Sequence, residues 1–256
     1  MQQIFSLARH VSNKHASLLV LLFCSLIATS QTRGYSSIPY GGTTFRAYTI
    51  KIDSYSVKRF ELLTNTSDAS HANMVNMANS KYGKCFMING ALADNGCSFI
   101  GLAINNGSEL APINTNNGSG AFYMKPNGVF SVNHKTAEVV ETNYYRAAND
   151  KHIAIQSGPM LLNNGSVHPE FRENSTNRYY RSGVGVFTKN GETFVVFAVS
   201  NEPINLYTAA KFFRDKFGCN NALSLQSSSA ATDIPFINAN ANTSNMKFCN
   251  YILYRE

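Results

Sequence analysis

The chain has 256 residues, of which 44% are hydrophobic, 12% aromatic and 14% charged, with 17 glycines, 7 prolines and no tryptophan. This composition is sufficient for a packed core and excludes collagen, coiled coil and wholesale disorder, because each needs a bias that is absent here. The formal net charge is +7, but lysine and arginine form no run typical of a nucleic-acid-binding arm. On charge alone, an anionic small molecule is as compatible a ligand as nucleic acid.

The first 30 residues are typical of a signal peptide. A positively charged leader precedes an apolar run over 18–27, and small residues follow at 28–30. Because the apolar run is too short to span a bilayer comfortably, we interpret it as a cleaved signal peptide rather than a membrane anchor. We therefore expect a secreted or periplasmic protein that meets the membrane only through this transient segment.

Cysteine usage agrees with export. Cleavage of the signal peptide would leave four cysteines, and an even number in an exported chain favours disulfides. No two of them have CxxC spacing and no histidine lies beside them, which disfavours zinc. All three connectivities remain open, with Cys219–Cys249 the favoured pair; the four are Cys85, Cys97, Cys219 and Cys249.

Hydrophobic patterning predicts many short strands and few helices. The predicted elements, in chain order, are a half-buried strand over 45–52, a helix over 67–81 capped by Asp68 or Ser70, strands over 85–88 and 99–104, a hairpin joining 121–124 to 129–132, a hairpin joining 183–188 to 192–200, a helix over 205–217 capped by Asn205 and stopped by Gly218, and strands over 223–225 and 248–254. We interpret the fold class as α+β. We expect a single domain over 44–256 with a mixed or antiparallel β-sheet core and a few flanking helices, after a flexible segment over 31–43.

Polar and glycine residues are densest in the second half of the chain. The run QSGPMLLNNGSVHPEF covers 156–171, and RSGVGV covers 181–186. A Gly-Pro before one strand and an arginine before a Gly-x-Gly strand can direct a guanidinium and bare backbone N–H groups at one anion. The same pattern also fits two ordinary loops with their arginines in solvent, and the pattern alone favours these loops. The P-loop, GxGxxG, HExxH and GxSxG signatures are absent.

These segments, taken together, resemble the phosphodiester glycosidase family. The resemblance is carried by the two runs above and by the helix that leads into GCNNALSL over 218–225. Upstream, FMINGAL over 86–92 and KPNGVF over 125–130 also resemble family segments, and the order and spacing match over about 45–254.

The resemblance implies hydrolysis of a sugar linked through its anomeric oxygen to a phosphodiester, of the N-acetylglucosamine-phosphate type. It implies that Arg181 neutralises phosphate, that His168 protonates the leaving group or binds phosphate, and that Asn89 holds a sugar hydroxyl or a water. The expected partner is a small-molecule or glycan substrate bearing a phosphodiester, not nucleic acid, and no metal or cofactor is expected. Substrate-binding positions are implied for Gly90, Ser157, Gly158, Pro159, Arg178, Gly185 and Gln226.

The sequence departs from the family pattern where an active-site carboxylate is expected. An Asp-Gly-Gly-Ser-like segment is replaced by LQSSSA over 225–230, with Gln226 in the place of the acid, and further departures occur at 92–93 and Ala121. Glutamine cannot ionise, so it cannot act as base or nucleophile. A second hypothesis is therefore a catalytically degenerate member that binds a phosphorylated glycan. The acids that could compensate are Asp94, Glu170 and Glu202.

Overall fold

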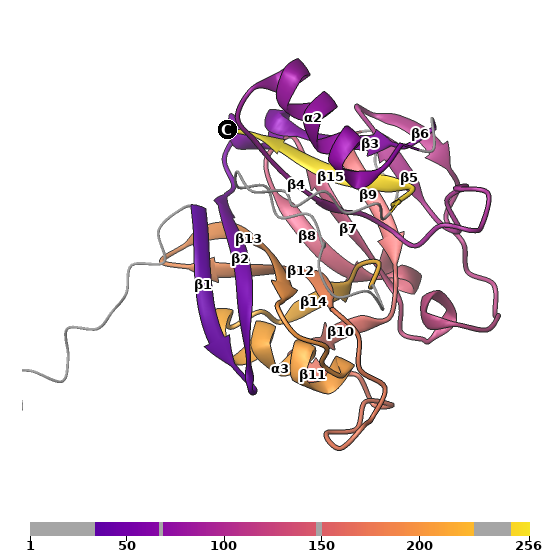
Figure 1. Cartoon of the computed structure of the whole chain (residues 1–256), viewed down its shortest axis with the longest axis vertical. Coiled ribbons are helices and arrows are strands. Elements are labelled where there is room, and N and C mark those ends of the chain that lie inside the picture. Colours follow the sequence, from indigo (N-terminus) through magenta and orange to yellow (C-terminus); the bar gives the residue numbers. More distant parts are fainter. Residues whose placement is uncertain (1–33, 67–68, 147–149, 228–246) are drawn as a thin grey trace, which may run out of the picture. The chain divides into compact units, whose positions relative to one another are not determined.

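The computed structural model describes residues 34–66, 69–146, 150–227 and 247–256 (Figure 1). The predicted signal peptide over 1–30 lies outside the described residues. Within them the protein is mostly antiparallel β-strand, with two α-helices, α2 (His71–Tyr82) and α3 (Leu206–Phe217). None of the described helices is long and apolar enough to cross a membrane.

The described strands form three antiparallel sheets. The seven-stranded sheet has the order β1 (Gly34–Tyr40), β2 (Thr43–Lys51), β13 (Glu192–Ser200), β12 (Ser182–Lys189), β14 (Asn221–Ser224), β10 (Met160–Asn163) and β11 (Ser166–Val167). The three-stranded sheet has the order β3 (Phe60–Thr64), β15 (Asn250–Arg255) and β4 (Cys85–Asn89). The five-stranded sheet has the order β6 (Ser108–Ala111), β5 (Ala103–Asn105), β9 (Lys151–Ser157), β7 (Gly128–Asn133) and β8 (Ala137–Glu141).

The main hydrophobic core is shared by all three sheets. Strand β13 shows how the sequence builds it, because successive side chains of a strand point to opposite faces. Val195 and Phe197 enter the shared core, whereas Phe194 and Val196 enter a second cluster under α3. Figure 1 shows α3 beside β10 and β11, and α2 beside the three-stranded sheet. Three 3₁₀ helices complete the described elements: η1 (Ser56–Arg59), η2 (Ala121–Tyr123) and η3 (Thr142–Tyr144).

Both predicted helices are confirmed, with their caps. The Ser70 hydroxyl accepts from the Asn73 N–H at the start of α2, and the Asn205 carboxamide accepts from the Thr208 N–H at the start of α3. Gly218 ends α3 in the left-handed conformation, with φ of 67°, as a glycine cap does. The predicted hairpin over 183–200 is also confirmed as β12 and β13.

Two predictions about local structure are wrong. Residues 121–124 do not pair with the following strand, because they form η2 and the Asn127 side chain donates to the Phe122 carbonyl at 2.9 Å; β7 pairs with β8 and β9 instead. The segment over 31–43 contains β1, which pairs with β2 along its length. The fold class also shifts, since the structure is mostly β with antiparallel sheets rather than a clear α+β fold.

The predicted disulfide exists, but with a different partner. Cys249 bonds to Cys97, not to Cys219, and so ties the loop after β4 to the segment before β15. Cys85 and Cys219 are free and buried. Cys219 lies in the cluster under α3, where burial raises the pKa of its thiol.

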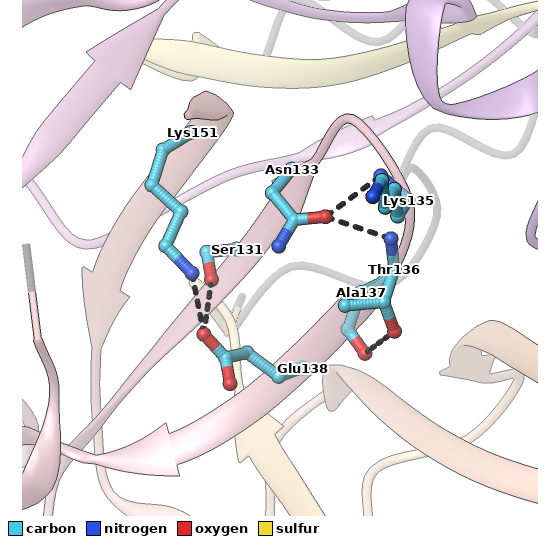
Figure 2. A network of polar contacts seen from close by, with 7 residues as sticks. All are labelled: Ser131, Asn133, Lys135, Thr136, Ala137, Glu138 and Lys151. Carbon is cyan, nitrogen blue, oxygen red and sulfur yellow. Dashed lines mark hydrogen bonds and ion pairs between the residues drawn. The ribbon is translucent and has the colours of Figure 1, made fainter. Parts of the chain in front are cut away.

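One buried lysine is neutralised within the five-stranded sheet (Figure 2). The Lys151 ammonium lies 2.6 Å from a Glu138 carboxylate oxygen, which also accepts from the Ser131 hydroxyl at 3.2 Å. At the adjoining β7–β8 turn, the Asn133 carboxamide oxygen accepts from the N–H groups of Lys135 and Thr136 at 2.8 and 2.7 Å. Glu138 is therefore engaged in holding this sheet.

Candidate functional site

Several predicted site residues meet at one end of the seven-stranded sheet. Strand β12 begins there, directly after Arg181, and the antiparallel strand β14 ends there. The N–H of Leu225 donates to the Ser182 carbonyl at 3.0 Å, and the N–H of Ser224 donates to the Pro159 carbonyl at 3.0 Å. Backbone pairing thus brings three segments to the same sheet end.

The end of strand β4, in the three-stranded sheet, contacts the segment that follows β14. The Gln226 N–H donates to the Gly90 carbonyl at 3.2 Å. The Asn89 carboxamide nitrogen donates to the Ser182 hydroxyl at 2.9 Å and to the Gln226 carbonyl. The Ser182 hydroxyl in turn donates to the same carbonyl at 2.9 Å. We call Asn89, Ser182, Gln226 and Arg181, with Ser227, the sheet-end cluster.

Arg181 is the charged member of the sheet-end cluster and is only 8% exposed. Its guanidinium donates to the Ile204 carbonyl at 3.2 Å, to the Asn177 carbonyl at 3.1 Å and side-chain oxygen at 3.3 Å, and to the Ser227 hydroxyl at 3.4 Å. It also lies 4.8 Å from the centre of the Tyr179 ring. All of these partners are neutral.

No carboxylate of the described residues lies within 4 Å of that guanidinium. Burial accordingly lowers the pKa of Arg181 from 12.5 to about 10, with a smaller opposing effect from Tyr179. Buried charges are ordinarily paired with an opposite charge. A buried cation whose partners in the described part of the chain are all neutral is therefore well suited to an anion from outside the chain.

The Ser157-Gly158-Pro159 segment lies beside the cluster through its backbone contact with β14. The Ser157 hydroxyl is buried and has no hydrogen-bond partner within the described part of the chain. A side chain at Gly158 would place its Cβ 2.8 Å from the Phe122 carbonyl oxygen, so this position requires glycine. Gln156, which precedes this segment, has a structural role, since its carboxamide accepts from the N–H of Asn114 and donates to the Asn114 carbonyl.

His168 is not brought into contact with Arg181. It follows β11, whereas Arg181 precedes β12, and β14 and β10 lie between them; three strand spacings correspond to about 14 Å. The His168 ring stacks on Phe171 with centroids 4.7 Å apart, and its Nδ1 accepts from the Glu170 N–H at 3.2 Å. Burial lowers the pKa of His168, against smaller raising effects of Glu170 and the Lys125 backbone. The ring is thus favoured in its neutral form.

Two other predicted residues are not part of the cluster, although the neighbours of Arg178 on either side, Asn177 and Tyr179, contact Arg181. Arg178 is exposed. A Cβ at Gly185 would lie 2.6 Å from the Cys219 sulfur and 2.9 Å from a ring carbon of Phe213, so Gly185 lies against the α3 side of the sheet. Its requirement for glycine comes from helix packing rather than from close approach to a ligand.

The three acids named as possible compensators make no contact with the cluster. Asp94 accepts from the N–H groups of Gly96 and Ser98 in a turn, and Glu170 and Glu202 are exposed. Within the described ranges, no three histidine, cysteine or acidic side chains are grouped so as to hold a metal ion.

No sequence motif singles out Ser182. Its hydroxyl joins β4 to the loop after β14. A serine at the start of a buried strand is a weak signal by itself. Only pairing across strands shows that its hydroxyl meets Asn89.

The fold and the cluster define an antiparallel β protein with a buried cationic group at a sheet end. The profile of the phosphodiester glycosidase family matches residues 82–246. The chain is 30% identical over 184 residues to the uncharacterized protein YigE of Escherichia coli (strain K12), covering 71% of each chain. The chain therefore belongs to the phosphodiester glycosidase family, a family of hydrolases, and the resemblance noted in the sequence is confirmed.

A solved structure supports the same fold. The auto-inhibited catalytic domain of zebrafish N-acetylglucosamine-1-phosphodiester alpha-N-acetylglucosaminidase, with its pro-peptide, superposes with a TM-score of 0.51. The match covers 87% of this chain and 81% of that chain, at 15% sequence identity. At this identity the likeness concerns the fold.

Proposed function

We propose that this protein is an exported hydrolase that cleaves the glycosidic bond of a sugar-1-phosphodiester of the N-acetylglucosamine-phosphate type. The observation that carries the proposal is Arg181, a buried guanidinium whose described partners are all neutral. A phosphodiester would supply the missing negative charge through charge-assisted hydrogen bonds. Family membership supports hydrolysis as the reaction.

In the proposed reaction, the bond between the anomeric carbon and the phosphodiester oxygen breaks and a water oxygen bonds to that carbon. The phosphate leaves with the bonding electrons as a phosphomonoester, and the water loses a proton. Negative charge grows on the phosphate as the bond breaks, so a fixed guanidinium stabilises the transition state more than the substrate.

Because the leaving group is a phosphomonoester, His168 is not required to act as a general acid. A phosphomonoester has a second pKa near 6, so it leaves as an anion at neutral pH with little need of a general acid. The lowered pKa of His168 makes its ring a poor proton donor at that pH. We propose that His168 acts as a neutral hydrogen-bonding group at the margin of the site.

Export is part of the proposal. The Cys97–Cys249 bond agrees with an oxidising compartment, and the first 30 residues are typical of a signal peptide. The outer face of a cell or the periplasm is also where a phosphodiester-linked envelope glycan would be met.

A second candidate function is binding of a phosphorylated glycan without turnover. One observation favours it: none of the described carboxylates contacts the sheet-end cluster. The family resemblance implies an acid in the place of Gln226. Glycoside hydrolysis ordinarily uses two carboxyl groups about 5–10 Å apart.

The two functions are separated by assaying the purified protein against UDP-N-acetylglucosamine and aryl glycosyl phosphodiesters, with calorimetric binding of N-acetylglucosamine 1-phosphate in parallel. Turnover that is lost in Arg181→Met but kept in Arg255→Met, an exposed arginine opposite Cys85 at the far end of β4 from Asn89, supports the hydrolase. Binding without turnover supports the second candidate. In that case Gln226→Asp, combined with Ser227→Gly and Ser228→Gly, is expected to create hydrolysis.

A further inference from the structure

The orientation of the Asn89 carboxamide is fixed by its neighbours. Its nitrogen faces the Gln226 carbonyl and the Ser182 hydroxyl. Because a carbonyl oxygen can only accept, the group that faces it must be the NH₂ and not the oxygen of the amide. Both N–H groups of Asn89 are thereby used.

The Asn89 carboxamide oxygen takes part in neither of these hydrogen bonds. It is buried, and it has no hydrogen-bond partner within the described residues. An amide oxygen is only an acceptor, and buried acceptors in native proteins nearly always receive a donor from protein, water or ligand. Whatever completes Asn89 must therefore donate a hydrogen bond.

The backbone on either side of Asn89 is held just as firmly. The Asn250 side chain accepts from the Ala91 N–H at 2.8 Å and donates to the Ala91 carbonyl at 3.0 Å, while the Asn250 carbonyl accepts from the Gly90 N–H at 3.0 Å. A Cβ on Gly90 would overlap the Asn250 side-chain oxygen. The disulfide at Cys249 ties the preceding residue to the same loop. The acceptor thus cannot turn easily to find another donor.

The positive charge of Arg181 limits which kind of hydrogen-bond donor can approach the Asn89 oxygen. Ser227, which follows Gln226, contacts the Arg181 guanidinium at 3.4 Å. A cationic donor such as an ammonium group would be repelled by this guanidinium, which has no carboxylate partner among the described residues. A neutral hydroxyl beside an anionic group meets both requirements.

We infer that Asn89 is a specificity-determining acceptor that selects ligands with a free hydroxyl donor close to the phosphate, and that Asn250 is the positioning residue that holds it. The substrate class is accordingly a sugar phosphodiester whose hydroxyl at this position is unsubstituted. This inference rests on the proposed function, in which Arg181 binds the phosphate. The inference about Asn89 adds a contact to the sugar and does not alter the proposed contact between Arg181 and the phosphate.

Fluorinated ligands test the direction of the hydrogen bond, because fluorine replaces a hydroxyl at similar size but cannot donate. The probes are inorganic phosphate, N-acetylglucosamine 1-phosphate and its analogues in which each ring hydroxyl in turn is replaced by fluorine. For the wild type, one analogue is expected to bind roughly 5- to 150-fold more weakly than the parent, the cost of leaving a buried acceptor unpaired. In Asn89→Leu this difference between the parent ligand and its fluorinated analogue is expected to vanish.

Asn250→Ala tests the positioning role, with Asn65→Ala as matched control. Asn65, directly after β3, is also buried and bridges backbone groups, accepting from the Ala69 N–H at 2.9 Å and donating to the Phe248 carbonyl at 3.0 Å. Both variants are expected to lower the melting temperature. Only Asn250→Ala is expected to reduce the preference for the hydroxyl over the fluorinated ligand.

The outcomes are distinguishable. If all fluorinated analogues bind as the parent does, Asn89 takes its donor from water and the inference is overturned while the proposed function stands. If both asparagine variants keep the full preference, Asn250 is structural only, and the positioning role is overturned. If the wild type binds neither inorganic phosphate nor the sugar phosphate, the proposed function itself fails, and the inference with it.

Discussion

Replacing Arg181 by methionine should separate stability from ligand binding. The substitution keeps an unbranched side chain of similar length in a site that is 8% exposed, but removes the charge. The hydrogen bonds lost are long, between 3.1 and 3.4 Å. One acceptor keeps a partner, because the Ile204 carbonyl also receives the Tyr179 N–H at 3.1 Å.

The magnitude follows from the pKa of Arg181. Lowering it from 12.5 to about 10 corresponds to about 3 kcal/mol of destabilisation of the charged form in the folded protein. Since the folded pKa lies below the unfolded one, this cost applies in full below about pH 10 and is relieved only as the pH rises above that value. Methionine removes the cost and forfeits hydrogen bonds worth about the same, so the free energy of unfolding should change little. Ligand affinity should fall by about 1.5–3 kcal/mol, or roughly 10- to 150-fold.

Thermal unfolding of Arg181→Met and of the wild type, each with and without phosphate, measures both quantities. We expect similar melting temperatures without ligand and a phosphate-dependent rise only in the wild type, because binding to the folded state stabilises it. Arg255→Met is the control, since that arginine is exposed and lies opposite Cys85, at the end of β4 away from Asn89. A marked loss of stability in Arg181→Met, together with unchanged phosphate affinity, would show that Arg181 is structural and refute the reasoning.

Three further predictions follow from the packing. Replacing Cys97 and Cys249 together by serine should cost about 2–5 kcal/mol in chemical denaturation, because the bond closes a loop between residues 152 positions apart; an unchanged midpoint would contradict this. Burial lowers the pKa of His168 below its unfolded value of 6.5, so stability should fall as the pH drops below that value, and His168→Asn should show a smaller fall in melting temperature between neutral and acid pH. Gly185→Ala should cost about 1–3 kcal/mol by overpacking the Cys219 sulfur, and Cys219→Ala in the same chain should restore part of that loss.

The parts of the fold that could be predicted from sequence are those set by local physics. The α3 helix carries its cap, its apolar face and its terminating glycine within consecutive residues, and the β12–β13 hairpin carries alternation and an Asn-Gly turn. The segment over 121–124 has similar strand-like residues but forms the η2 turn, whose Phe122 carbonyl accepts from the Asn127 side chain five positions further on. Strand-like residue types alone do not reveal that bond.

The candidate site likewise has a part that the sequence predicts and a part that only the folded structure reveals. Arg181, Asn89 and Gln226 could be named from motifs because the family resemblance keeps their order in the chain. Their contacts depend on Ser182, whose hydroxyl joins a strand of one sheet to the loop that follows a strand of another. The spacing of His168 from Arg181 likewise depends on strand order: the two are 13 residues apart in sequence, but two strands lie between them in the sheet.

Gln226 does not by itself decide between hydrolysis and binding. In an ordinary glycoside the leaving group is an alcohol, and a carboxylic acid must protonate it. In the proposed reaction a phosphate leaves as a stable anion, so a general acid would be dispensable and the charge of Arg181 would stabilise the leaving group. What remains necessary is a group that activates water, and an amide cannot do this. The pH dependence of turnover therefore decides: a rate that rises with pH in proportion to hydroxide would mean that no protein base acts, whereas a plateau would require an ionising group near the sheet-end cluster.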